Sequence, residues 1–295
     1  MLYSGISKAN GIGEATLPWA VEYTETVHGN LDAGFAYLNQ GHVDNHHRDA
    51  LAAQLWLRGP RFGKVSVAAG LGPLYYFDTV REANGKPYAN HHGLGMIFAA
   101  QAQWQVHPRW FVALEANHAI VRRSFDTTAL MLGVGYRWDA ALATAPTLRD
   151  GGDRHEIDLL VGQSVVNSFD AEHGFAASLE YRRTVLPWLD WAVAAIDEGD
   201  ADLVNRRGIA TQLWLTRRVL DDRLTLAAGL GPYFARDRHE SMPGDGRRDR
   251  VHALLSISAS YSLTPRWRVR AIWHRVATGD HRDSDIFLGG IGYGF

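Results

Sequence analysis

"HPRWFVALEANHAIVRRSFDTTALMLGVGYRW", residues 107–138, returns later in the chain as "TPRWRVRAIWHRVATGDHRDSDIFLGGIGYGF", residues 264–295. The two passages align without a gap at an offset of 157, and both end in Gly-x-Gly-Tyr-x-aromatic. Other segments repeat as well: "AAQLWLR" from Ala52 returns as "ATQLWLT" from Ala210, and "AAGLGP" from Ala68 returns from Ala227. The offset stays between 157 and 159, which is too long for a solenoid repeat and indicates a duplicated domain or half-domain.

Alternation of polar and apolar residues predicts β-strands in both copies. In "HALLSISASYSL" the four serines from Ser256 to Ser262 share one face, and Leu255, Ile257 and Tyr261 share the other. Each copy divides into eight such strands, so the sequence predicts an all-β fold.

The connections between the predicted strands alternate between long and short. Long polar stretches include residues 39–49, 77–92 and 236–250, whereas the intervening turns are as short as "HPR" and "TPR". This alternation, with strands of about 9–11 residues or more, is typical of an up-and-down membrane barrel. The sequence has no uninterrupted apolar run of 18 or more residues, so no transmembrane helix is expected.

Composition narrows the function classes. The formal net charge of −2 gives no basic footprint for nucleic-acid binding, and the absence of cysteine excludes disulfides and thiolate metal sites. The residues after Met1 do not form a basic segment followed by an apolar core, so an exported protein would need a signal peptide that this sequence lacks.

The terminal "GIGYGF", ending at Phe295, resembles the C-terminal assembly signal of Gram-negative outer-membrane β-barrel proteins. One copy, with its eight strands and long outer loops, is similar to the small eight-stranded outer-membrane proteins. The resemblance implies a bacterial outer-membrane location. It also implies contact with outer-membrane lipids and lipopolysaccharide, and assembly by the barrel-assembly machinery through the C-terminal strand.

Two architectures are compatible with this pattern. Our leading prediction is a transmembrane antiparallel up-and-down β-barrel with 16 strands in one barrel; the alternative is two tandem eight-stranded barrels. The first repeat covers residues 1–138, a periplasmic linker covers 139–155, and the second repeat covers 156–295. Three arginines on one face, Arg266, Arg268 and Arg270, favour a wide wet lumen, unless Glu156, Asp158 and Glu180 neutralise them in a narrow one.

Polar residues on the inward faces are the candidate site. The predicted pore-lining residues are Glu22, Gln54, Arg58, Gln101, Gln103, Arg109, Glu115, Asn117, Glu180, Arg182, Gln212, Arg266, Arg268, Arg270 and His274. Read as a pore wall, they predict a porin-like channel for passive diffusion or export of small hydrophilic or polymeric solutes, with the three arginines favouring anions. Read as a hydrogen-bonded filling, they predict a structural or adhesive barrel with binding outer loops. The channel interpretation also predicts a secretion or polysaccharide-export partner.

Other features carry weaker hypotheses. Aromatic residues at strand ends form a predicted membrane girdle: Trp104, Trp110, Tyr136, Trp138, Tyr261, Trp267, Tyr293 and Phe295. Recurring aspartates where strands meet outer loops are expected to cap turns or to pair with loop arginines: Asp78 and Asp237, and Asp126 and Asp283.

Two chemical functions have little support. A lipid-modifying enzyme of the lipid A deacylase type would need a His-x-Ser-Asn motif, which neither His118 nor His274 provides, so we expect no catalytic residues. Histidines near His46 and His91 could bind a divalent metal, but the second copy keeps no histidine in the segment equivalent to that around His46, and no metal or cofactor is expected.

Overall fold

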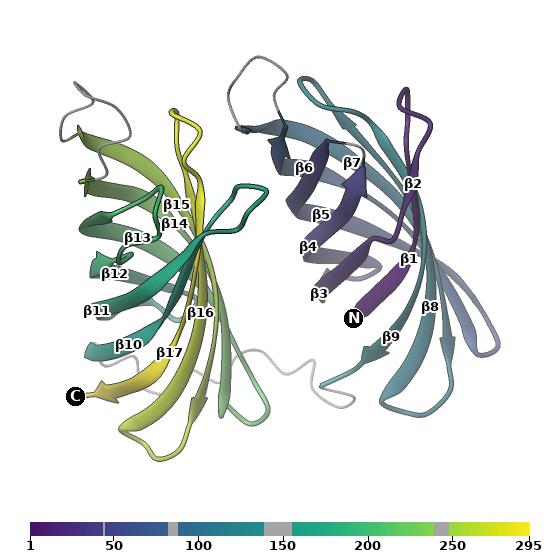
Figure 1. The fold of residues 1–295 in the computed structure, drawn as a ribbon. Coiled ribbons are helices and arrows are strands. Elements are labelled where there is room, and N and C mark those ends of the chain that lie inside the picture. Colours follow the sequence, from purple (N-terminus) through teal and green to yellow (C-terminus); the bar gives the residue numbers. More distant parts are fainter. Residues whose placement is uncertain (44, 82–87, 139–154, 239–247) are drawn as a thin grey trace. The chain divides into compact units, whose positions relative to one another are not determined.

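The computed structural model describes residues 1–43, 45–81, 88–138, 155–238 and 248–295, and it divides the chain into two compact units, Met1–Ala140 and Ala141–Phe295. Every regular element in the described residues is a β-strand (Figure 1). These residues accordingly include no helix that could span a membrane. The predicted linker, 139–155, lies outside the described residues except for His155, where the first strand of the second unit begins.

Unit 1 is an antiparallel sheet that closes on itself. Its strands in the described residues are β1 (Leu2–Ala9), β2 (Ala15–Thr16), β3 (Trp19–His28), β4 (Leu31–Val43), β5 (His46–Phe62), β6 (Val65–Val80), β7 (Ala89–Gln105), β8 (Trp110–Val121) and β9 (Thr127–Tyr136). Each strand from β3 to β8 pairs with the next in sequence, and β1 pairs with both β3 and β9. The ring therefore contains eight full strands, with the short β2 as an extension of β3 along β1.

The interruption between β2 and β3 has a local cause. Pro18 lies between them and has no backbone N–H, so it cannot donate a ladder hydrogen bond. Its carbonyl still accepts a hydrogen bond from the Gly5 N–H at 3.3 Å, which keeps the two strands together. The corresponding strand of unit 2, which has Ala176 at this position, is continuous over 14 residues.

Unit 2 closes more regularly. Its strands in the described residues are β10 (His155–Val166), β11 (His173–Leu186), β12 (Leu189–Asp197), β13 (Arg206–Val219), β14 (Leu224–Asp237), β15 (Arg248–Ser262), β16 (Trp267–Ala277) and β17 (Ser284–Gly294). They form a closed barrel in which β10 pairs with β17 along the whole strand, from Glu156 opposite Gly294 to Val166 opposite Ser284.

The leading prediction of one 16-stranded barrel is therefore wrong, and the alternative of two tandem eight-stranded barrels is correct. A 16-stranded ring would require β1 to pair with β17 and β9 with β10, whereas β1 pairs with β9 and β10 with β17. The physical reason lies in the interior. Small side chains and glycines line it, and the interior arginines have carboxylate partners in place of water, so eight strands suffice to enclose it.

Residues 39–49 were also predicted wrongly as a long loop. β4 and β5 run through most of this segment, and Asn45 makes the turn with a φ of 61°. The pairing shifts between Asn39 and His42, where Gly41 has a φ of 80°, so a bulge allows polar residues to remain within the sheet.

A tryptophan recurs at the same place in both interiors. Trp56 and Trp214 are almost fully buried, and a Cβ built on Gly70 or Gly229 would lie 2.6 Å from the facing indole ring. Each indole therefore lies against a glycine on the neighbouring strand, so close that any larger residue would force the ring or the strand to shift. In both copies the "QLW" segment supplies the tryptophan and the "AAGLG" segment supplies the glycine that it packs against.

Candidate functional site: the barrel interiors

The interior of unit 2 is organised around Arg270 on β16. One Nη atom of Arg270 lies 3.0 Å from Asp158 on β10 and 2.6 Å from Glu180 on β11. Next to it, Arg268 contacts Glu156 at 2.8 Å. Each of the two arginines therefore has a carboxylate partner inside the ring, which is the condition that a narrow lumen requires.

Trp214 extends this network towards the opposite wall. The guanidinium carbon of Arg182 lies 4.3 Å from the indole centroid and that of Arg270 lies 5.1 Å from it, both within cation–π range. Arg182 also contacts Glu180 at 3.0 Å and Asp190 at 3.6 Å. Side chains from β11, β13 and β16 therefore meet inside the ring.

A second set of polar contacts fills the same interior towards β15. The Ser256 Oγ and His274 Nδ1 lie 2.6 Å apart, and Gln212 donates to the Ser256 Oγ at 2.8 Å. A serine beside a histidine is a familiar nucleophile–base pair, but His274 is fully buried and its ring packs against Trp214. The pair is part of the filling, with no exposed face at which a substrate could react.

Unit 1 fills its interior with amides and a phenol. Gln101 contacts the Tyr3 hydroxyl at 2.5 Å and Glu115 at 3.3 Å, and Asn117 donates to Glu115 at 3.1 Å. Gln103 donates to Gln101 at 2.5 Å. Ala113 occupies the position of Arg270, so the two interiors share their geometry and differ in their chemistry.

Each barrel has its own buried arginine near the loop end, and this arginine joins strands on opposite sides of the ring. In unit 2, Arg206 contacts Glu198 at 3.3 Å, the Ser284 hydroxyl at 3.4 Å and the Arg282 carbonyl at 2.9 Å. β13 and β17 are four strands apart in the eight-stranded ring, so the Arg206–Ser284 contact crosses it.

Arg48 makes the equivalent bridge in unit 1. It donates to Gln40 at 2.5 Å, to the Thr127 hydroxyl at 3.2 Å and to the Phe125 carbonyl. Its guanidinium also lies 4.0 Å from the centre of the Phe125 ring. We refer to the two sets of contacts around Arg48 and Arg206 as the loop-end braces.

The recurring aspartates hold the loops beside these braces, as their position at the strand ends predicts. Asp126 accepts a hydrogen bond from the Val121 N–H at 2.9 Å, and Asp283 accepts the equivalent bond from the Thr278 N–H at 2.7 Å. Asp237 contacts Arg282 at 3.3 Å, which confirms the predicted pairing with a loop arginine.

The loop acid Asp280 shows opposing effects on its pKa. Burial by itself acts to raise it, but a hydrogen bond with Thr278 and the charge of Arg250 outweigh this effect and lower the pKa below its ordinary value. The residue therefore remains ionised at neutral pH and holds Arg250 at 3.2 Å.

The predicted interior residues fall into three groups. Ten are buried: Glu22, Gln54, Gln101, Glu115, Asn117, Glu180, Arg182, Gln212, Arg270 and His274. Gln103 and Arg268 are half-buried beside them. Arg58, Arg109 and Arg266 are exposed at the turn ends: Arg58 contacts Asp32 at 3.3 Å, and the other two donate to the Tyr136 and Tyr293 hydroxyls.

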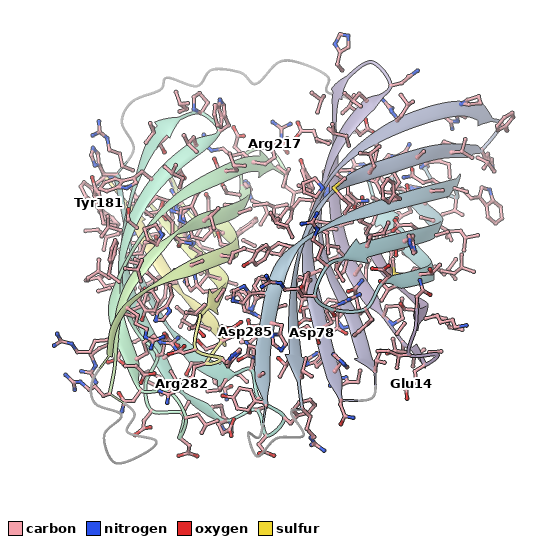
Figure 2. All side chains as sticks on the ribbon, turned by 90° about the horizontal axis from the view of Figure 1, so that it is seen from above. Glu14, Asp78, Tyr181, Arg217, Arg282 and Asp285 are labelled. Carbon is pink, nitrogen blue, oxygen red and sulfur yellow. The ribbon has the colours of Figure 1, made fainter. Side chains whose placement is uncertain are left out.

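The predicted girdle residues lie on the outer side of the walls, near the short turns. Six are exposed and the two tyrosines, Tyr136 and Tyr293, are half-buried. Trp110 packs on Tyr136 and Trp267 on Tyr293, each pair with ring centres 4.9 Å apart. Figure 2 shows Tyr181 on the outer side of β11 as well, where its hydroxyl lies 2.7 Å from His155.

Four of the histidines near the long loops of unit 1 contact neighbouring side chains. His42 stacks on His47, His46 contacts Asp78 at 3.0 Å, and His92 lies 3.0 Å from the Tyr75 hydroxyl. Among the described residues, no three histidine or acidic side chains are grouped so that they could hold a metal ion.

Sequence reasoning missed the two arginines of the loop-end braces because they stand in stretches that resemble loops. Their recurrence is the signal that could have found them, since Arg48 and Gln40 return as Arg206 and Glu198 at an offset of 158. A cation and a polar partner that keep the same spacing in both copies indicate a contact that both barrels need.

A search against models of protein families finds no match, and neither does a search of curated proteins. Solved structures with a similar fold include the N-terminal β-barrel domain of Pseudomonas aeruginosa OprF, with a TM-score of 0.36 and 8% identity over 46% of this chain and 93% of that chain. The NanC porin has a TM-score of 0.23 with 7% identity over 99% of both chains. The CymD monoaromatic hydrocarbon channel has a TM-score of 0.25 with 12% identity over 99% of this chain and 86% of that chain.

Proposed function

We propose that this chain is a bacterial outer-membrane protein made of two filled barrels, each of which acts as a rigid anchor that presents binding loops. The leading function inferred from the sequence is passive diffusion through an open lumen. The contacts inside both barrels agree less well with an open lumen than with a filled one. The observation that carries the proposal is the pair of loop-end braces, because Arg48 and Arg206 each join opposite walls of a narrow ring.

The outer walls support the membrane location. Leu2, Leu94 and Leu132 in unit 1, and Leu159 and Leu213 in unit 2, are each more than half exposed. Soluble proteins rarely expose contiguous apolar surface of this extent, whereas a lipid-facing wall requires it. β10 has 12 residues, which at about 3.3 Å per residue and a tilt of about 40° cover roughly 30 Å, the thickness of the hydrocarbon core.

The interior contacts support a closed lumen in each unit. In unit 2 the charged groups are paired with one another, and Trp214 occupies the space between Arg182 and Arg270. A solute would have to separate these pairs in a confined space, and a buried charge that loses its partner costs about 3–5 kcal/mol. A diffusion pore needs instead a continuous hydrated path whose charged groups face water.

Conductance of the full-length chain in planar lipid bilayers tests this proposal. We expect no stable current steps from protein that is folded, as verified by heat-modifiable migration of the same sample in gels. Steps of the size of open porins would overturn the filled-barrel function and restore the channel.

A further inference from the structure

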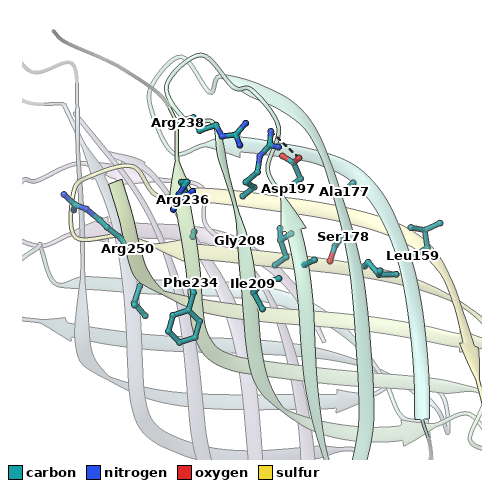
Figure 3. A pocket seen from close by; sticks show the side chains of 16 residues that line it. Leu159, Ala177, Ser178, Asp197, Gly208, Ile209, Phe234, Arg236, Arg238 and Arg250 are labelled. Atoms are coloured by element: carbon teal, nitrogen blue, oxygen red, sulfur yellow. Dashed lines mark ion pairs between the residues drawn. The ribbon is translucent and has the colours of Figure 1, made fainter. Parts of the chain in front are cut away.

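The wall of unit 1 has a weak line between β1 and the two strands β2 and β3, which we refer to as the β1–β3 seam. β1 pairs with β3 at three positions, Leu2–Ser4, and with β2 at two, Ser7 and Lys8. The equivalent strands of unit 2, β10 and β11, share 11 consecutive pairs. Figure 3 shows part of this continuous wall, with Leu159 of β10 beside Ser178 of β11. The two units therefore differ in how firmly this part of the ring is closed.

Pro18 removes one hydrogen bond from the middle of the seam. The register places Gly5 opposite Pro18, and the Gly5 N–H donates to the Pro18 carbonyl at 3.3 Å. The return bond to the Gly5 carbonyl cannot form, because proline has no backbone N–H. Further along the seam the Ala9 N–H donates to the Glu14 carbonyl at a shorter distance, 3.0 Å. Since a backbone group without a partner is costly in a membrane wall, the closed seam is less stable here than elsewhere in the ring.

A side-chain contact that crosses the equivalent line in unit 2 is also missing from unit 1. In unit 2, Ser164 on β10 donates to the Glu198 carbonyl at 2.5 Å, which joins β10 to the end of β12 across β11. Ser7 and Gln40 occupy these two positions in unit 1. The Ser7 hydroxyl is buried and has no hydrogen-bond partner among the described residues. Unit 1 therefore lacks both a backbone bond and a side-chain contact across the same line.

The two sides of the seam differ in character. On the outer side, Ile6 and Leu17 face each other across the gap in the pairing and are 61% and 75% exposed, so no described residue covers the seam from outside. On the inner side, Tyr3, Ser7 and Ala9 are buried. A molecule that crossed the seam would pass from a lipid-facing apolar surface to the Ser7 hydroxyl.

The part of the chain that would move is short. The turn before β2 contains Gly11 and Gly13, with φ of 89° and 85°, and a Cβ on either would meet nothing within 4 Å. β1 is held on its other side by eight consecutive pairs with β9. The loop-end brace holds the rest of the ring, since Gln40 on β4 donates to Thr127 on β9 at 2.9 Å. Residues 15–18 can therefore separate from β1 while the remaining ring stays closed.

We propose that unit 1 opens locally along the β1–β3 seam and gives small apolar molecules in the membrane a route to the Ser7 hydroxyl. Hydrophilic solutes stay excluded, because the route begins in lipid and the loop-end brace closes the barrel on its outer side. The space for such a molecule comes from the outward movement of residues 15–18. This inference rests on the proposed membrane location, and the wall of unit 2 should stay closed.

Labelling of single cysteines in the otherwise cysteine-free chain tests this route. In lipid vesicles, S7C should react with the membrane-soluble reagent N-phenylmaleimide at least about tenfold faster than S164C, its counterpart in unit 2. A charged, water-soluble methanethiosulfonate should react slowly with both. In S7C/P18A, the restored N–H should slow the reaction with the maleimide at least about fivefold. The reciprocal substitution A176P should accelerate the labelling of S164C.

Hydrogen exchange in detergent micelles tests the opening without a cysteine. The Gly5 amide should exchange at least about tenfold faster than the Gly162 amide, its counterpart in unit 2, and P18A should remove most of this difference. Heat-modifiable migration in gels verifies that each variant is folded.

Equal labelling rates for S7C and S164C in folded protein would overturn the proposal, as would a rate for S7C that P18A leaves unchanged. Faster labelling of S7C by the charged reagent would also overturn it, because the route would then begin in water. Equal exchange of the Gly5 and Gly162 amides would contradict the local opening itself. The outcome is separable from the proposed function, because a conducting protein that still shows labelling dependent on Pro18 would refute the filled barrel and leave the seam intact.

Discussion

The Nη1 atom of Arg270 lies 2.6 Å from the Oε1 atom of Glu180, and both side chains are almost completely buried inside the second barrel. The contact joins β16 to β11 across the intervening strands β17 and β10. The buried charge of Arg270 does not destabilise the barrel, because closure of the ring holds its carboxylate partners in place. The pair therefore links the closure of the barrel to the filling of its lumen.

Removal of Arg270 should destabilise unit 2 strongly. An Arg270→Ala variant leaves Asp158 and Glu180 buried without their shared cation, and we expect a loss of about 3–5 kcal/mol in the free energy of unfolding. Urea unfolding in lipid vesicles, followed by tryptophan fluorescence, measures the loss. Arg266→Ala, at an exposed turn position, should change the value by less than about 0.5 kcal/mol. Equal effects of the two substitutions would contradict the buried network.

Trp214 and Gly229 should behave as one packing unit. Trp214→Ala removes a fully buried indole and should cost about 3–5 kcal/mol, whereas Gly229→Ala forces a methyl group against the ring and should cost about 1–3 kcal/mol. In the double variant the methyl group has room, so the combined cost should be smaller than the sum. A double-mutant cycle measures this coupling, and strict additivity would disprove the direct contact.

The loop-end brace of unit 2 should depend more on Arg206 than on the charge of Glu198. Glu198→Gln recreates the Arg48–Gln40 pair of unit 1 and should cost about 1 kcal/mol, since the hydrogen bond to the arginine is retained. Arg206→Ala removes the contacts to Glu198, Ser284 and the Arg282 carbonyl, and should cost about 3–5 kcal/mol. Urea unfolding in lipid vesicles measures the loss in the free energy of unfolding for both variants. A larger loss in the free energy of unfolding for Glu198→Gln than for Arg206→Ala would contradict the equivalence of the Arg48–Gln40 and Arg206–Glu198 pairs.

Asp283 should control the opening of the loop between β16 and β17. Its carboxylate accepts hydrogen bonds from both the N–H and the hydroxyl of Thr278, at 2.7 and 2.9 Å. Asp283→Ala leaves buried donors without this acceptor, so we expect a local loss of about 1–3 kcal/mol. Hydrogen exchange of the Thr278 amide should become correspondingly faster. Unchanged protection in the variant would mean that another group holds the loop.

The alternation of inward and outward residues was predictable from the sequence because each strand carries it locally. The serines of β15 could be assigned to one face, and Leu255, Ile257 and Tyr261 to the other, from their spacing alone. The ring size could not be assigned in this way. An eight-stranded and a 16-stranded barrel have the same strands and turns, and they differ only in whether Leu2 faces Val134 or Ile291, partners far away in the chain.

The site was partly predictable for the same reason. Glu156, Asp158 and Glu180 could be suggested as partners of the arginines because they lie on inward faces, and all three make these contacts. The direction of exposed arginines at strand ends was not predictable, since Arg266 follows its turn and reaches Tyr293 outside the wall.

Each half of the chain closes on itself, and engineered disulfides probe this closure in a protein that has no cysteine of its own. Leu2 faces Val134, and Leu159 faces Ile291, so their Cα atoms are about 4.5–5.5 Å apart and within the range for a disulfide. We predict that L2C/V134C and L159C/I291C each cross-link within one chain on mild oxidation, whereas the exchanged pairs L2C/I291C and V134C/L159C do not. Cross-linking of the exchanged pairs in place of the first two would establish a single 16-stranded barrel and refute two separate rings.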